Sequence, residues 1–380
     1  MTKKPQERSN NIRMKKNKVN SLYIHIPFCN AICDYCDFTK LQYFRIFAVK
    51  YLEQLEKELL KEVTDKDLKT IYVGGGTPTS LEDDLFLKLL QMISPFTKNV
   101  KEYTFECNPE SLSLNKIKMM KEYGVNRISI GVESTDDEIL KSINRQHTFE
   151  MVKEKVELLR KNGISNINLD LILGLPNVTE KMLEKDIKNI LSLNPNHISC
   201  YSLTVHEHTV FFLNEILPPS DEFAYEAYKM VDTVLSKAGY EHYEVSNWSK
   251  PGYRSEHNLT YWRNEEYYGI GLGASGYVNG VRYKNTTNLN KYLEGQNEKE
   301  EETVSIKDLE EYQIMLNLRT LEGLDLKRFK ELFNKDLYAY KRDVIDSYIQ
   351  SGHLKMVDDH LIPTFEGMMI LDKITLDLFA

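Results

Sequence analysis

The chain has 380 residues, of which 41% are hydrophobic and 28% charged, and its formal net charge is −8. This length suffices for a barrel-sized domain with a smaller domain beside it. The negative charge disfavours general binding to a phosphate backbone, so no nucleic-acid partner is expected. No apolar run is long enough to cross a bilayer, so no transmembrane segment is predicted. Five cysteines without a secretory signal favour a reduced, cytoplasmic protein.

The first residues of the chain differ from the rest in composition. Residues 1–20 are polar and rich in lysine and arginine, and we interpret them as a disordered basic tail. From residue 21 to residue 203, short β-branched runs alternate with amphipathic stretches, which is typical of strand–helix units. Six such units predict a parallel α/β sheet with right-handed crossovers, either an open wound sheet or a partial barrel. The predicted strands are 21–26, 69–73, 101–106, 126–132, 166–172 and 197–203.

Residues 204–297 are less regular and are predicted to form an extension of this domain. A helix is expected at 221–238, where alanine and valine recur on one face. After it comes an aromatic block that contains both tryptophans of the chain, Trp248 and Trp262. The acidic run Glu298–Glu302 is interpreted as a linker.

Residues 305–380 are predicted to form a small C-terminal domain. Helices at 307–320 and 325–348, a hairpin through 357–363 and a closing helix indicate a winged-helix-like α+β shape. That shape raises a DNA-binding alternative, but the segment holds ten basic and fourteen acidic residues. The charge balance weighs against nucleic acid, and a lid or docking role is favoured.

Three cysteines stand directly after the first predicted strand, in the run Cys29-Asn30-Ala31-Ile32-Cys33-Asp34-Tyr35-Cys36. An odd cluster of thiols in a chain without a secretory segment does not predict disulfides. Structural zinc normally takes four ligands in paired spacing, and this pattern lacks both features. Three thiolates suit a [4Fe–4S] cluster with one iron left open, so Cys29, Cys33 and Cys36 are the predicted metal ligands.

Polar or glycine residues follow each predicted strand. In parallel α/β folds the carboxyl ends of the strands carry the chemistry, so these residues are expected to meet at one mouth. The glycine run Gly74–Gly76 lacks the spacing of a dinucleotide fingerprint or a phosphate-binding loop. Taken alone, it is either a tight turn or a place where a ligand approaches bare backbone. The other strand-end residues are Glu106, Glu133, Asp170 and Tyr201, and Arg145 lies nearby in the sequence.

The Cys-x3-Cys-x2-Cys spacing, with Tyr35 before the last cysteine, resembles the radical S-adenosylmethionine (SAM) superfamily. In that superfamily the amino and carboxylate groups of SAM chelate the open iron of the cluster, and an electron from the cluster cleaves SAM to a 5′-deoxyadenosyl radical. The resemblance implies a partial (β/α)6 barrel of the TIM type. It also implies SAM contacts from Tyr23, Tyr35, Gly75, Gly76, Thr77, Glu106, Glu133, Arg145 and Asp170.

Further motifs narrow the resemblance to the oxygen-independent coproporphyrinogen III oxidase group. They include Tyr23–Cys29, the glycine run with Thr-Pro-Thr, and Gly174-Leu175-Pro176. The decarboxylating oxidases of that group continue the motif with a fourth cysteine, where this chain has Phe38. Their glutamine is replaced by Glu133, which leaves the pose of SAM open.

The heme-chaperone (HemW-like) branch of the group matches better, because it has Cys-Asp-Phe and the motif His-Asn-x-x-Tyr-Trp, which begins here at His257. The resemblance implies a chaperone that binds the cluster, SAM and heme, with His257 on heme, and hands heme to an acceptor protein that the sequence does not identify. The alternative is a coproporphyrinogen dehydrogenase-type oxidoreductase, an enzyme that would need an electron donor such as flavodoxin or ferredoxin. A bland alternative for His257 is a hydrogen-bonded core histidine.

Overall fold

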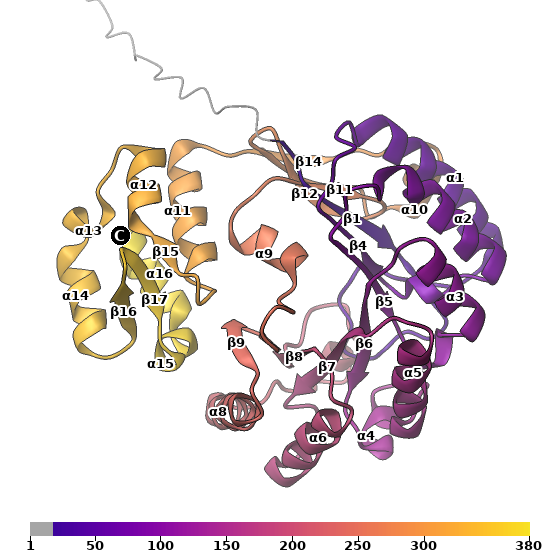
Figure 1. The fold of residues 1–380 in the computed structure, drawn as a ribbon, viewed down its shortest axis with the longest axis horizontal. Coiled ribbons are helices and arrows are strands. Elements are labelled where there is room, and N and C mark those ends of the chain that lie inside the picture. The colour runs from indigo at the N-terminus through magenta and orange to yellow at the C-terminus, as the bar shows by residue number, and fades with distance from the viewer. Residues whose placement is uncertain (1–17) are drawn as a thin grey trace, which may run out of the picture.

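The protein is described here by a computed structural model, which covers residues 18–380. Its main feature is a mixed sheet of twelve strands. Seven strands that are consecutive in this sheet run parallel to one another. Six of these seven are the predicted strands, and each new strand adds beside the previous one without a reversal of order (Figure 1). That order is the one of a barrel and not of a doubly wound sheet. The strands are β1 (Ser21–Ile26), β4 (Thr70–Gly75), β5 (Glu102–Cys107), β6 (Arg127–Glu133), β7 (Asn166–Leu173) and β8 (His197–Ser202).

Helices connect these strands and cover the outer face of the sheet (Figure 1). The first of these helices buries one apolar stripe, in which Ala48, Leu52, Leu55 and Leu59 are almost fully inaccessible, as expected of the predicted amphipathic stretches. Side-chain caps at Ser113, Thr148 and Thr179 set the starts of three of them. The helices are α1 (Arg45–Glu62), α2 (Asp83–Ile93), α3 (Leu114–Glu122), α4 (Asp137–Ser142), α5 (Phe149–Lys161) and α6 (Glu180–Ser192).

The extension continues the same sheet at both of its edges. The predicted helix is α8 (Asp221–Lys237), after which β9 (Glu241–Glu244) and β10 (Asn247–Ser249) join the β8 edge antiparallel. After α9 (Glu256–Trp262) the chain crosses to the other edge, where β11 (Tyr267–Ile270) pairs parallel with β1. The remaining strands at that edge are β12 (Ser275–Val278), β13 (Val281–Lys284) and β14 (Glu300–Thr303).

The acidic linker prediction is wrong. Residues Glu300–Thr303 form the outermost strand β14, which pairs antiparallel with β13. Its glutamates are exposed, and charged side chains on an edge strand discourage pairing with a second molecule. Lys299 also ties this segment to Glu62 of α1 at 3.1 Å.

The C-terminal segment has its own apolar core, and its hairpin of β16 (Leu354–Val357) and β17 (His360–Pro363) confirms the predicted wing. The long helix predicted at 325–348 is wrong, because Asn334 adopts a left-handed conformation and Asp336 caps a new helix. Three helices replace it, α12 (Leu326–Phe333), α13 (Leu337–Tyr340) and α14 (Arg342–Gln350). They lie between α11 (Ile306–Asn317) and α15 (Phe365–Met369), which is followed by α16 (Leu371–Phe379).

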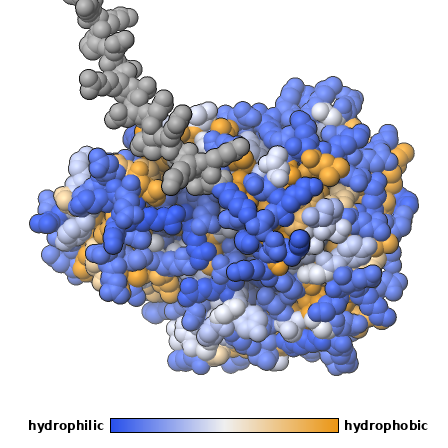
Figure 2. All heavy atoms as spheres, turned by 45° about the horizontal axis from the view of Figure 1, so that its top comes forward, coloured by the Kyte–Doolittle hydropathy of each residue, from blue (hydrophilic) through white to orange (hydrophobic). Residues whose placement is uncertain are grey.

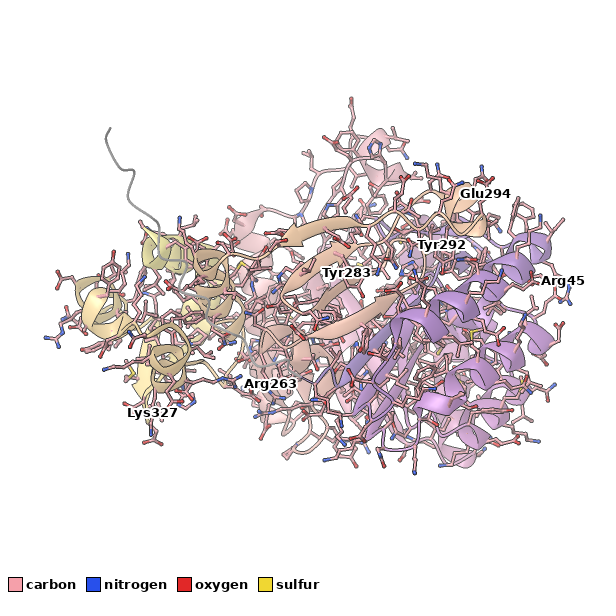
Figure 3. All side chains as sticks on the ribbon, turned by 90° about the horizontal axis from the view of Figure 1, so that it is seen from above. Arg45, Arg263, Tyr283, Tyr292, Glu294 and Lys327 are labelled. Carbon is pink, nitrogen blue, oxygen red and sulfur yellow. The ribbon has the colours of Figure 1, made fainter. Side chains whose placement is uncertain are left out.

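The C-terminal domain rests on the extension near α9 (Figure 1). Arg263, labelled at this junction in Figure 3, donates to Glu322 from Nε at 2.8 Å and from Nη2 at 2.6 Å. Asn317 donates to the carbonyl of Trp262 at 2.7 Å. The face shown in Figure 2 is mostly hydrophilic, with hydrophobic side chains in small separate patches. Within residues 18–380 no helix combines the length and apolarity that a bilayer crossing requires. The predicted tail lies almost entirely outside the described residues.

Candidate functional site

One cavity of about 290 Å³ opens at the carboxyl ends of the parallel strands. It brings together eleven of the predicted site residues, which confirms that they share one mouth but leaves their roles untested. They are Cys29, Cys33, Cys36, Tyr35, Gly75, Gly76, Thr77, Glu106, Glu133, Arg145 and Asp170. Tyr23 and His257 are not among the residues that line it.

Cys29 is the last residue of β2 (Phe28–Cys29) and is buried. Cys33 and Cys36 lie in the loop that leads from β2 to β3 (Leu41–Gln42) and are half-buried. The loop is tightened by the Cys36 amide, which donates to the Cys33 carbonyl at 3.2 Å. Burial raises the pKa of the Cys36 thiol to about 11, and the ammonium of Lys40 acts in the opposite direction. The Cys36 thiol therefore holds its proton at neutral pH and must release it when it binds a metal.

Two polar groups point at the sulfur atoms. Thr77 directs its hydroxyl at Cys29 Sγ at 3.6 Å, and Arg145 Nη1 donates to Cys33 Sγ at 3.5 Å. Gly76 leaves the space that Cys29 needs, because a Cβ at residue 76 would lie 2.9 Å from Cys29 Sγ. Donors aimed at sulfur stabilise thiolates, so this end of the cavity is built for bound metal and not for neutral thiols.

The glycine run on β4 makes close contacts with the strands on either side. Gly75 has a φ of +113°, and its amide donates to Glu106 Oε2 at 2.9 Å. A Cβ at Gly74 would lie 2.5 Å from the same carboxylate oxygen. A side chain at Gly74 would therefore displace the Glu106 carboxylate, and Gly75, with its positive φ, presents bare backbone to the cavity.

Three carboxylates line the middle of the cavity. Glu106 accepts from the hydroxyl of Tyr72 at 2.7 Å, and Asp170 accepts from Asn168 at 2.6 Å and from Ser129 at 3.1 Å. Burial raises the pKa of Glu106 and of Glu133 to about 7, and it raises the pKa of Asp170 as well. Within residues 18–380, no ion pair involves Glu106 or Asp170. The Arg127 guanidinium, which lines the same cavity, acts against burial on the pKa of both carboxyls.

Glu133 owes its direction to an irregularity in the sheet. The register between β6 and β7 shifts between Gly131 and Glu133, and Glu133 takes a left-handed φ of 65°. This bulge turns the carboxylate toward Arg145, at 3.9 Å. Arg145 also donates to Asn108 at 3.0 Å, while its Nε is buried without a partner.

The structure does not support the prediction that His257 binds heme. Its side chain is 0% exposed, and both ring nitrogens are engaged, with Thr70 at 2.8 Å and with Tyr261 at 2.7 Å. The ring also stacks on Tyr72, with centroids 5.2 Å apart. Burial lowers the pKa of His257 to about 3. The histidine is therefore a neutral core residue that supports Tyr72, as in the bland alternative.

Tyr23 likewise lies behind the cavity, where its hydroxyl bonds to His25 Nδ1 at 2.9 Å. Sequence reasoning missed other lining residues, although one signal was present. Arg127, Ser129, Gly131 and Glu133 occupy every second position of β6. Because side chains two apart on a strand share a face, Arg127 and Ser129 could have been placed beside the predicted Glu133. Further missed lining residues are Lys40, Asn108, Asn168, Ser199, His206 and Asn258.

Comparison with known proteins agrees with this geometry. Residues 23–190 match the model of the radical SAM superfamily, and residues 305–370 match the HemN C-terminal domain. The heme chaperone HemW of Bacillus subtilis (strain 168) is 38% identical, over 94% of this chain and 98% of the relative. The chain belongs to the HemW family of radical SAM proteins. This confirms the branch that the sequence motifs predicted.

Other members of the HemW family show similar coverage. The HemW of Lactococcus lactis is 41% identical over 83% of this chain and 86% of the relative, and that of Escherichia coli is 32% identical over 94% and 97%. Among solved structures, the coproporphyrinogen III oxidase HemN of Escherichia coli, a radical SAM enzyme, superposes with a TM-score of 0.80. The superposition covers 96% of this chain and 91% of the HemN chain. Because the two sequences are only 20% identical, the similarity shows the fold alone.

The site fits the two cofactors that the radical SAM family implies. Within residues 18–380, no three His, Cys, Asp or Glu side chains are close enough to bind one metal ion. A [4Fe–4S] cluster has a different ligand requirement, because each of three irons binds one thiolate and the three sulfur atoms need not converge on one point. The neighbouring half-buried carboxylates and the unpartnered Nε of Arg145 suit a ligand with both positive groups and a carboxylate, as SAM has.

Proposed function

We propose that this chain binds a [4Fe–4S] cluster, SAM and heme, and that it passes heme to an acceptor protein. The observation that carries the proposal is the alignment with proteins named heme chaperones, which spans 98% of one relative and includes the C-terminal domain. The exposed phenylalanine Phe38, at the place of the oxidases' fourth cysteine, points the same way. The thiols require a reducing compartment, so we place the protein in the cytoplasm.

We infer that different lining residues of the cavity serve different parts of this function. Cys29, Cys33 and Cys36 would hold the cluster through their three thiolates, and a [4Fe–4S] cluster bound in this way keeps one iron open to a ligand. The carboxylates of Glu106, Glu133 and Asp170 offer partners to the positive groups of SAM, and Arg145 offers one to its carboxylate. Gly75 and Gly76 present backbone to it.

The alternative function is oxygen-independent oxidation of coproporphyrinogen III, with flavodoxin or ferredoxin as the electron donor. The similarity to the HemN structure is the observation behind it. The two functions predict different outcomes with the same anaerobically reconstituted protein. A chaperone takes up heme and transfers it to an apoprotein such as apomyoglobin, whereas an oxidase forms protoporphyrinogen from coproporphyrinogen III with SAM and a reductant.

We expect heme uptake and transfer without protoporphyrinogen formation. The Cys33→Ala variant serves as a control, because a protein without its cluster must yield no protoporphyrinogen under either hypothesis. Protoporphyrinogen formation by the wild type, or an absence of heme binding, would overturn the chaperone proposal.

A further inference from the structure

The mouth of the cavity carries exposed side chains that the cluster and SAM do not need. Phe38, from the cysteine loop, is 64% exposed, and Tyr201, at the end of β8, is 44% exposed. Both line the cavity. Apolar and aromatic side chains exposed together at the rim of a pocket mark a binding surface. This rim is defined here as Phe38, Lys40, Tyr201 and His206.

His206 is the histidine of this rim. All nine histidines of the chain lie in the described residues, and His206 is the one that lines the cavity. Its side chain is 51% exposed, in contrast to the fully buried His257. An exposed imidazole beside a cavity offers a ring nitrogen to a metal without any unfolding of the core.

The surroundings of His206 resemble those of a metal-binding histidine. Its Nε2 lies 2.9 Å from Thr204 Oγ1 and 3.5 Å from Asp37 Oδ2. Within residues 18–380, no hydrogen bond ends on its Nδ1. Histidines that bind metals through one nitrogen usually have the other nitrogen hydrogen-bonded to a carboxylate or an oxygen atom, which fixes the ring.

The other rim residues complement a porphyrin and not a generic apolar partner. A flat aromatic macrocycle stacks on rings such as those of Phe38 and Tyr201. Its propionate groups need a cation, and Lys40 stands at the rim, where its ammonium donates to the carbonyls of Cys36 and Phe38 and keeps its charge for an anion. A membrane or a peptide would use the apolar surface but would not need an imidazole and an ammonium at the same rim.

We propose that His206 is an axial ligand of heme iron, and that Phe38 and Tyr201 hold the macrocycle at the mouth of the cavity. The inference rests on the proposed function, since it names the place where the heme of that function binds. It also places heme next to the cysteine loop, because His206 contacts Asp37, the neighbour of Cys36.

The test is a heme titration of the reconstituted full chain. For His206→Ala we expect the heme Kd to rise by about tenfold or more, together with a changed Soret band. Added imidazole should restore the wild-type spectrum of His206→Gly, which a purely structural role would not produce. The matched control is His208→Ala, an exposed histidine two residues away that does not line the cavity and should leave heme binding unchanged.

Metal-free protoporphyrin IX separates the ligand from the aromatic contacts. His206→Ala should bind it as the wild type does, whereas Phe38→Ala should bind both porphyrins more weakly. A wild-type Soret band and Kd in His206→Ala would overturn the inference and leave the chaperone proposal standing. If the wild type binds no heme at all, both fail.

Discussion

Replacement of Glu106 by glutamine tests the electrostatics of the cavity. Glutamine has the same shape and accepts from the Gly75 amide as the carboxylate does, but it carries no charge. Burial raises the pKa of Glu106 from the ordinary value of 4.5 to about 7, and the charge of Asp170 acts in the same direction. Below pH 4.5 the folded and unfolded states are both protonated, so the carboxyl costs no stability there.

As the pH rises from 4.5 to 7, the unfolded chain releases this proton before the folded protein does. The free energy of unfolding of the wild type therefore falls through this window and levels off above pH 7. A pKa change from 4.5 to about 7 corresponds to at most about 3 kcal/mol. Because the side chain borders the cavity and is partly solvated, we expect about 2 kcal/mol.

Urea unfolding of the cofactor-free protein between pH 5 and pH 8 measures this difference. Glu106→Gln should gain about 2 kcal/mol over the wild type at pH 8 and lose most of that advantage at pH 5. The exposed Glu122→Gln is the matched control and should show no such trend. In the reconstituted protein the same substitution should weaken SAM binding. A stability difference between Glu106→Gln and wild type that does not change with pH would refute the reasoning.

Three further predictions concern the same site and its support. Cys33→Ala should abolish the visible absorbance and most of the iron of the anaerobically reconstituted protein, and stoichiometric zinc in the wild type would contradict it. Gly76→Ala should lower iron content, because its Cβ would approach Cys29 Sγ to 2.9 Å, and unchanged iron would show that the loop can move. His257→Leu should lower the free energy of unfolding by about 1 to 3 kcal/mol, since half-buried Tyr261 loses its hydrogen bond to the imidazole and buried Thr70 keeps only its bond to Ser21. Calorimetric or urea unfolding measures it, and a change under 1 kcal/mol would argue against this role.

The sequence alone determined which edge of the sheet carries the candidate site. The six parallel strands were predictable because each is a short β-branched run between amphipathic helices. Their carboxyl ends then had to meet, so Cys29, Glu106 and Asp170 could be placed at one mouth before any coordinates were known. The cysteine motif indicates its own chemistry. Three thiolates within a run of eight residues can bind three irons of a [4Fe–4S] cluster, which leaves the fourth iron free.

The tertiary structure decided what depends on contacts between distant residues. The pairing of β11 with β1 and of β14 with β13 joins segments whose local pattern says nothing about their partners. A motif likewise does not reveal which side of a helix faces the core. His257 stands in an aromatic motif but is sealed under Tyr72, whereas His206 stands in an unremarkable segment that the fold carries to the mouth. Burial is set by the whole sheet, and it is burial that separates a structural histidine from one that can reach a ligand.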